Sequence, residues 1–266
     1  MSTSTVVALG GNLGTVPATF VSAVQALQQI DGCRVAAVSP NFMTRAIGSD
    51  AGNDYVNAAV LLEAACSPIE LLAKLQAIER RLGRVRNVHW GPRTLDLDLV
   101  SYGDEMIIDH DDLPGAKLSD VNAAFKLLVS TQQAKLIVPH PACWYRRFVL
   151  DPWCEVAPDW QHPVLRESVR SMRDRLRQRP LRLSFVPGPG AEKLANELRS
   201  SFSSTQIELV EASSSNDMQF WSGTGDSLPS QISLRSTRLP SYEETETAKQ
   251  VVRAMLDEPQ QLASKP

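Results

Sequence analysis

The segment TLDLDLV, residues 94–100, constrains the fold of this chain more than any other stretch of its sequence. Leu95, Leu97 and Leu99 alternate with Asp96 and Asp98, and this two-residue repeat predicts a β-strand. Successive side chains of a strand point to opposite faces, so the leucines should enter a core while both carboxylates project from the other face. Like charges on neighbouring same-face positions repel each other, which predicts a positively charged partner beside them.

The elements around this strand predict an α+β layer sandwich with a mainly antiparallel sheet. Ser67 and Glu70 form the capping box of the clearest helix, residues 67–83, which Gly83 ends. A second helical repeat covers residues 17–30. Further strands are expected at 4–10, 33–44 and 55–64. Two strand–helix–strand units in series favour helices layered on one sheet.

The second half of the chain is harder to read. Residues 109–135 look like an insert with a small helix at 119–130, and residues 164–179 like an arginine-rich helix with a solvated face. After Pro180 a strand, turn, helix and strand reach residue 212, and a Ser-rich stretch, a strand at 232–237 and a helix from Ser241 follow. We predict a first domain at 1–180 and a C-terminal α/β extension at 181–266, which is either a small second domain or packed on the first.

Composition limits the partners and the compartment. The net charge of −3 gives no reason to expect nucleic-acid or membrane binding. The N-terminus lacks the basic start of a signal peptide, and no stretch is apolar enough to span a bilayer. Four cysteines without a CxxC spacing favour a reduced, cytoplasmic protein, which we expect to be a monomer or a weak oligomer.

Basic residues just before the acidic strand point to phosphate chemistry. Arg84, Arg86 and Arg93 could grip phosphate oxygens, because guanidinium groups match them with two hydrogen bonds. Asp96 and Asp98 could hold Mg²⁺, which takes hard oxygen ligands and fills its shell with water and phosphate. A solvent-facing strand is the plain alternative. A metal nuclease is disfavoured because no basic groove or further carboxylate cluster accompanies the pair.

Several motifs together resemble one family. GGNLG, DYVNAAV, IERRLGRVR, HWGPRTLDLDLVSYG, VPHP and RRFVLDPWCEVAPD occur in the order found in 6-hydroxymethyl-7,8-dihydropterin pyrophosphokinases of folate biosynthesis. The resemblance covers about residues 5–165, apart from the insert. It implies a ferredoxin-like α+β fold and transfer of a diphosphoryl group from ATP to the pterin hydroxymethyl group, with AMP released. A catalytically silent pterin- or nucleotide-binding module is the alternative.

The resemblance also implies a role for each matched position. Catalytic positions are Arg84, Arg93, Asp96, Asp98 and His140, of which Asp96 and Asp98 would bridge two Mg²⁺ ions. Pterin-binding positions are Gly10, Thr44, Ile47, Tyr55, Asn57, Trp90 and Phe148, with the pterin stacked between Tyr55 and Phe148. ATP-binding positions are Gln76, Glu79, Arg84, Arg86, Arg93, His140 and Arg146. Arg86 and Trp90 would belong to a mobile loop, disordered without substrate, that closes over the site.

Some of these assignments stay open at the level of sequence. A solvated helix face would explain Gln76 and Glu79 equally well, and Arg147 beside Arg146 leaves the register of the phosphate contact undecided. Gly11 stands where the family usually has serine, which should loosen the turn. Arg45 stands where the family usually has proline, which leaves the stiffness of the pterin loop in doubt.

Overall fold

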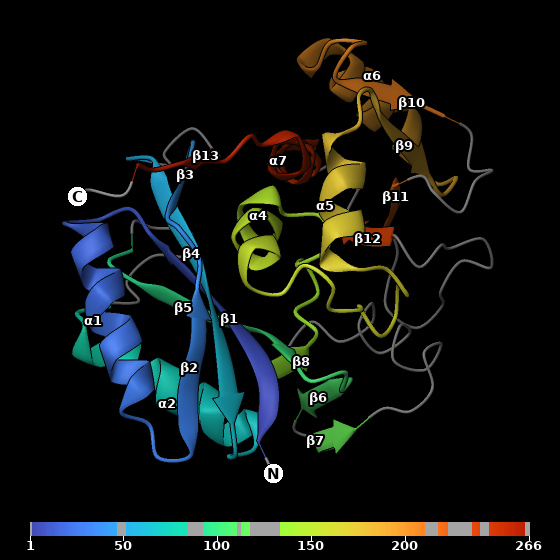
Figure 1. The fold of residues 1–266 in the computed structure, drawn as a ribbon. Helices are drawn as coiled ribbons and strands as arrows, with labels where there is room; N and C mark the ends of the chain where they lie inside the picture. The colour runs from blue at the N-terminus through green and yellow to red at the C-terminus, as the bar shows by residue number, and fades with distance from the viewer. Residues whose placement is uncertain are drawn as a thin grey trace.

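The structure, a computed structural model, describes residues 2–46, 52–84, 93–110, 113–117, 134–210, 218–222, 236–239 and 245–263 (Figure 1). In these residues the strands form a six-stranded sheet, a four-stranded sheet and a three-stranded sheet. The molecule is a mixed α/β structure whose largest sheet is antiparallel, as expected.

The six-stranded sheet is built around β1. Its strands are β1 (Thr3–Gly11), β2 (Cys33–Val38), β3 (Phe42–Thr44), β4 (Tyr55–Ala64), β5 (Asp96–Tyr102) and β13 (Gln260–Gln261). β1 lies between β4 and β5, and both β2 and β3 pair with β4. The single strand expected at 33–44 is therefore wrong: the sequence Ser39-Pro40-Asn41 separates two strands, and proline has no N–H to offer a ladder.

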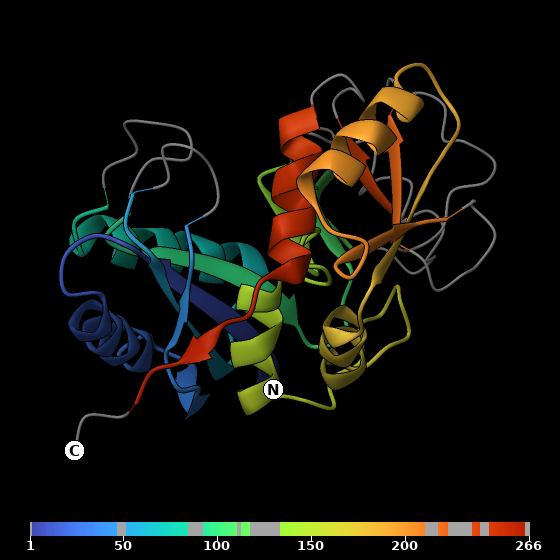
Figure 2. The same ribbon diagram turned by 90° about the horizontal axis from the view of Figure 1, so that it is seen from above.

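Helices cover both faces of this sheet. α1 (Val16–Gln28) and α2 (Pro68–Arg81) lie on one face and α4 (Arg147–Val156) on the other (Figure 2). The predicted leucine face is confirmed, since Leu95, Leu97 and Leu99 are all buried in the core beside α1 and α2. The predicted capping box is also present: the Ser67 hydroxyl accepts the Glu70 N–H, and the Glu70 side chain accepts the Ser67 N–H.

The predicted insert begins as part of a small sheet. β6 (Ile107–His110) pairs antiparallel with both β7 (Leu113–Lys117) and β8 (Leu136–Val138). Two of these strands thus lie wholly or partly inside the range that we assigned to an insert. The small helix expected at 119–130 lies outside the described residues.

The region after α4 contains a second, parallel sheet. Its order is β10 (Ile207–Leu209), β9 (Leu181–Phe185), β11 (Met218–Ser222) and β12 (Ser236–Leu239). The associated helices are α5 (Val169–Arg177), α6 (Ala191–Ser201) and α7 (Thr245–Leu256). β11 was missed, because it follows a Ser-rich stretch that reads as a linker.

The arginine-rich helix differs from our expectation. α5 is shorter than residues 164–179 and buries Met172 and Leu176. The Arg175 side chain is only 16% exposed and its Nε lies 3.4 Å from a carboxylate oxygen of Glu167. A solvated face is therefore wrong for Arg175, whose Nη1 also donates to Met218 Sδ of β11 at 3.2 Å.

One apolar core crosses the expected domain boundary at residue 180. Val6 and Ala59 of the large sheet belong to the same buried cluster as Trp153 of α4, Phe220 of β11 and Met255 of α7. The chain after Pro180 thus packs directly on the rest. Among the described helices, none has the length and apolar character needed to cross a membrane.

Candidate active site

The candidate site lies where β1 ends and β4 and β5 begin. Gly10 is paired with Asn57 on one side and with Asp96 on the other. A Cβ atom on Gly10 would lie 3.6 Å from Asn57 Oδ1 and 3.8 Å from Asp96 Cβ. The glycine therefore leaves the space between an amide and a carboxylate free of side chain.

Asp96 and Asp98 project from the face opposite the buried leucines, as the alternation predicts. Asp98 is paired with Ala8, which packs against the core on the α4 side. The expected positive partner is present at Asp96: Arg84 Nη1 lies 2.6 Å from Oδ1, and Arg93 Nη1 donates to Oδ2. Within the described residues, no ion pair to Asp98 is found. Among the described residues, the two carboxylates therefore differ in how far their charge is compensated.

Glu79 of α2 contacts both the strand that carries the two aspartates and the arginine that pairs with Asp96. It is 2% exposed, accepts the Leu97 N–H at 2.7 Å through Oε1, and is ion-paired with Arg84. Burial raises the pKa of Glu79, against the opposing effects of the Leu97 N–H and Arg84. The solvated helix face is therefore excluded for Glu79, whereas Gln76, one turn earlier on α2, is half-buried. Glu79 orients Arg84 toward Asp96.

Asn12 is a residue that our sequence reasoning missed. Its Oδ1 accepts the Arg93 N–H at 2.8 Å, and its own N–H donates to the Arg93 carbonyl at 2.9 Å. This reciprocal pair ties the segment before β5 to the end of β1. Asn12 is 4% exposed, and the only signal in the sequence was its position directly after Gly10-Gly11.

Gly11 also serves this contact. A Cβ atom there would lie 2.8 Å from the Thr94 carbonyl oxygen, closer than two such atoms can approach. The glycine thus permits a close backbone approach at this turn. Serine at this position would require the backbone to move.

The residues assigned to the pterin gather at the same end of the sheet. Asn57 Nδ2 donates to Thr44 Oγ1 at 2.9 Å, and both side chains are 5% exposed. Tyr55 is the β4 partner of Thr44 and is half-buried; burial raises the pKa of its hydroxyl. Phe148, in the first turn of α4, is half-buried as well.

His140 and Arg146 approach the site from the segment before α4. The His140 N–H donates to the Val100 carbonyl of β5 at 2.9 Å, and its Nδ1 accepts the Ala142 N–H at 3.1 Å. Burial, and after it the Arg146 charge, lowers the pKa of His140 to about 3. The ring is therefore neutral at physiological pH, and its remaining proton is on Nε2.

The two neighbouring arginines have different surroundings. Arg147 is buried in a bidentate ion pair with Asp151 on the same helix, with bonds of 2.9 and 2.7 Å. Arg146 instead lies over the rings of Tyr145 and Phe148, 5.8 and 5.7 Å from their centroids. Its guanidinium is thus near the expected site, and that of Arg147 is committed to α4.

Three of the predicted site residues, Ile47, Arg86 and Trp90, lie outside the described residues. The other positions are all described. They lie in β1, β3, β4, α2, β5 and α4 or, for Arg84, Arg93, His140 and Arg146, in the segments that flank these elements. Among the described residues, no group of three or more His, Cys, Asp and Glu side chains could hold a metal ion. A metal at this site would therefore depend on two carboxylates and on ligands from a substrate.

Comparisons with known proteins point to one family. Residues 6–158 match the family described as 7,8-dihydro-6-hydroxymethylpterin-pyrophosphokinase. The 2-amino-4-hydroxy-6-hydroxymethyldihydropteridine pyrophosphokinase of Synechocystis is 40% identical over 158 residues, which are 59% of this chain and 68% of that protein. The enzyme of the same name from Pseudomonas aeruginosa is 35% identical over 157 residues, 59% of this chain and 82% of that protein.

A more distant likeness is found among solved structures. A crystal structure of an HPPK-DHPS protein in complex with substrates aligns with a TM-score of 0.46 and 14% identity over 65% of this chain. This chain spans only 43% of that protein. Because the family match covers more than half of the chain and includes every element of the candidate site, the chain belongs to the 7,8-dihydro-6-hydroxymethylpterin pyrophosphokinase family.

Proposed function

We propose that this chain transfers a diphosphoryl group from ATP to the hydroxymethyl oxygen of 6-hydroxymethyl-7,8-dihydropterin, yielding AMP and the pterin diphosphate of folate biosynthesis. Membership of the family supports this reaction. The observation that carries it is the shared end of the sheet: Asp96 and Asp98 project from one face, Asp96 is ion-paired with two arginines, and only β1 separates it from the buried amide of Asn57. Groups suited to phosphate and to a pterin are thus adjacent.

The donor set fits Mg²⁺. Two carboxylates on one face supply hard oxygen ligands, and ATP phosphates and water can complete octahedral shells. Asp98 is the better available ligand, because among the described residues it has no ion pair to give up. We propose that Asp96 and Asp98 together hold two Mg²⁺ ions, which when bound would neutralise the triphosphate and align the attacking oxygen with the β-phosphorus.

The arginines have a second role in this proposal. Arg84 and Arg93 now compensate Asp96, and an exchange of partners would free them to contact phosphate oxygens when ATP binds. Their positive charge would then offset negative charge that shifts during the transfer. Glu79 keeps Arg84 near this position through its buried carboxylate.

His140 would act as a neutral hydrogen-bond donor. Because its Nδ1 accepts the Ala142 N–H, the Nε2–H is the group that can donate to a phosphate oxygen. Arg146 would bring a cation to the same side, supported by the rings on which it lies. We assign no such role to Arg147, because its side chain is buried and its Nε and Nη2 both donate to the Asp151 carboxylate.

The pterin would be read by its amide edge and held by its flat faces. Asn57 and Thr44 form a buried polar pair. A buried polar group without a hydrogen-bond partner costs free energy, so pterin analogues that lack the amide edge should bind more weakly. Tyr55 and Phe148 would stack on the bicycle, each worth about 1–3 kcal/mol. Ile47, Arg86 and Trp90 keep the roles expected from the family.

Two finer inferences accompany this function. The order β5-β1-β4, with β2 and β3 both paired to β4 and every pair antiparallel, supports a ferredoxin-like arrangement for residues 3–102. Four free thiols support a cytoplasmic location.

Measurement of AMP release from ATP by the full chain tests the proposal. We expect AMP only when Mg²⁺ and the hydroxymethyl-dihydropterin are both present. Omission of either component, and replacement of Mg²⁺ by EDTA, are the matched controls. Binding of pterin and ATP without any AMP would instead establish the catalytically silent module, and AMP formed without pterin would exclude the transfer.

A further inference from the structure

The end of the described chain returns to the first sheet. We call residues 257–263, which follow α7, the C-terminal strap. Within it β13 pairs antiparallel with β3, placing Gln260 opposite Met43 and Gln261 opposite Phe42. The Leu262 N–H donates to the Asn41 carbonyl at 2.8 Å. The strap runs from the second half of the molecule across to the edge of the large sheet (Figure 2).

The strand that the strap covers carries part of the proposed pterin site. β3 spans only three residues, and its other edge pairs with β4, with Thr44 opposite Tyr55. Thr44 in turn accepts the hydrogen bond of Asn57. A three-residue strand held on one side only is weakly defined, whereas pairing on both sides fixes its position. The strap therefore helps to fix the position of the Thr44 hydroxyl.

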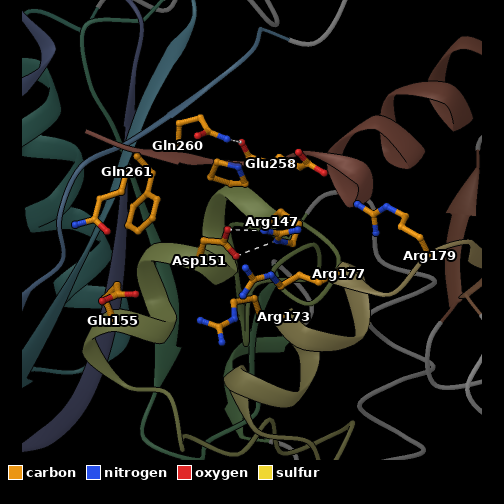
Figure 3. A pocket seen from close by; sticks show the side chains of 11 residues that line it. Arg147, Asp151, Glu155, Arg173, Arg177, Arg179, Glu258, Gln260 and Gln261 are labelled. Atoms are coloured by element: carbon orange, nitrogen blue, oxygen red, sulfur yellow. Dashed lines mark hydrogen bonds and ion pairs between the residues drawn. The ribbon is translucent and has the colours of Figure 1, made fainter. Parts of the chain in front are cut away.

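The strap spans a polar hollow instead of packing on the core. A cavity of about 510 Å³ lies beneath it, lined by Phe42, Glu258, Pro259, Gln260 and Gln261 and by charged residues of α4 and α5. Figure 3 shows the Arg147–Asp151 ion pair on its far side, with Arg173 and Arg177 beyond. Because backbone pairing to β3 is its main attachment, the strap can be removed without opening the apolar core.

We propose that the C-terminal strap positions the pterin-binding strand β3, so that an extension outside the region matched by the family tunes affinity for the pterin. The inference rests on the proposed function, because it takes Thr44 and Asn57 as the pterin-reading pair. Residues 96 and 98 are on the far side of β1 from β3, so the strap has no direct route to the nucleotide. Its effect should fall on the pterin and spare ATP.

Three variants of the full chain separate positioning from general stability. The first ends at Glu258 and so lacks β13. The second, Leu262→Pro, removes the N–H that donates to Asn41. The third, Gln261→Pro, is the matched control. In an antiparallel pair only every second residue donates its N–H to the neighbouring strand, so the Gln261 N–H faces away from β3 and its loss removes no hydrogen bond to β3.

Pterin affinity is measured by calorimetry in the presence of Mg²⁺ and a non-hydrolysable ATP analogue. The affinity for the analogue and the midpoint of thermal unfolding are measured for each variant as well. We expect the dissociation constant for the pterin to rise about tenfold in the truncated chain and about threefold in Leu262→Pro, because ladder bonds of ordinary strength are lost. Gln261→Pro should match the unchanged chain. Affinity for the ATP analogue should stay the same in all three variants.

The outcomes that overturn the proposal are distinct from failure of the proposed function. Equal pterin affinity in the unchanged and truncated chains overturns the role of the strap, as does equal weakening by Leu262→Pro and Gln261→Pro. If truncation prevents folding, the comparison of the two proline variants still decides. A full chain that neither binds the pterin nor forms AMP overturns the proposed function itself.

Discussion

Asp96 and Asp98 are chemically identical side chains with different charged partners among the described residues. Asp96 is paired with Arg84 and Arg93, and the structure describes no cation beside Asp98 in the residues that it covers. A carboxylate already compensated by the protein gains less from a metal than one that is not. Asp98 should therefore be the residue through which a bound cation most lowers the barrier to transfer.

Asp98→Asn tests this difference at the residue scale. We expect turnover to fall by about 10²–10³-fold, several kcal/mol in the transition state, because the amide keeps the shape but loses the charge that holds the ion. Pterin affinity should be nearly unchanged. The assay is AMP release beside a pterin titration, with Asp104→Asn, an exposed turn residue after the same strand, as the control. Normal turnover in Asp98→Asn would contradict the metal role.

At the scale of elements, the segment between α4 and α5 is organised by a buried histidine. His162 is 5% exposed, and its Nδ1 accepts the N–H groups of Val164 and Leu165, each at 3.2 Å. Burial lowers the pKa of His162 to about 3. Protonation of Nδ1 would displace both hydrogen bonds, so the turn is compatible only with the neutral ring.

This arrangement predicts a pH dependence of stability. In the unfolded chain His162 takes up a proton near pH 6.5, while the folded state resists it down to about pH 3. Its stabilising contribution is therefore complete above pH 6.5 and falls as the pH is lowered, by up to about 1.4 kcal/mol per unit. His162→Asn supplies an acceptor that does not titrate.

Urea unfolding between pH 4 and 8 provides the measurement. The unfolding free energy of His162→Asn should fall less steeply below pH 6.5 than that of the unchanged chain. His140 and the carboxylates contribute to the pH dependence of both proteins, so the difference between the two curves reports on His162. Parallel curves for the two proteins would show that His162 titrates alike in the folded and unfolded states.

At the scale of the whole molecule, the two sheets share one core. Leu181, Leu198 and Val252 pack in the same cluster as Leu150 and Trp153 of α4. A separate first domain at 1–180, one of the two arrangements expected from the sequence, implies that truncation after about residue 180 leaves measurable activity. The shared core argues against that expectation, because the cut would expose the apolar faces of both α4 and α5.

We accordingly expect the chain cut after Pro180 to be insoluble or to lack a cooperative thermal transition. The physical reason is the loss of apolar burial, about 25 cal/mol for each Å² returned to water, over several helices and strands. Circular dichroism during heating, with the chain cut after Glu258 as the control, makes the measurement. A cooperative transition in both truncated chains would show that residues 1–180 fold on their own.

Local patterns in the sequence were sufficient to predict β5 and α2, although not the break between β2 and β3. The alternation of leucine and aspartate predicted the strand, its buried face and the paired carboxylates, because a strand repeats every two residues. The capping box at Ser67 and Glu70 placed the start of α2, since its hydrogen bonds join residues only three apart. The motifs around these elements were enough to indicate the family that the comparisons confirm.

Only the tertiary structure decided which groups of these elements meet. Asn12 and Arg93 are 81 residues apart in the sequence, and Glu79 reaches the Leu97 N–H from another element. The choice of Arg146 over Arg147, the burial of Arg175 and the return of β13 to β3 have no signal in local spacing. Such contacts depend on how helices and strands pack, and packing joins residues whose separation along the chain carries no periodic pattern.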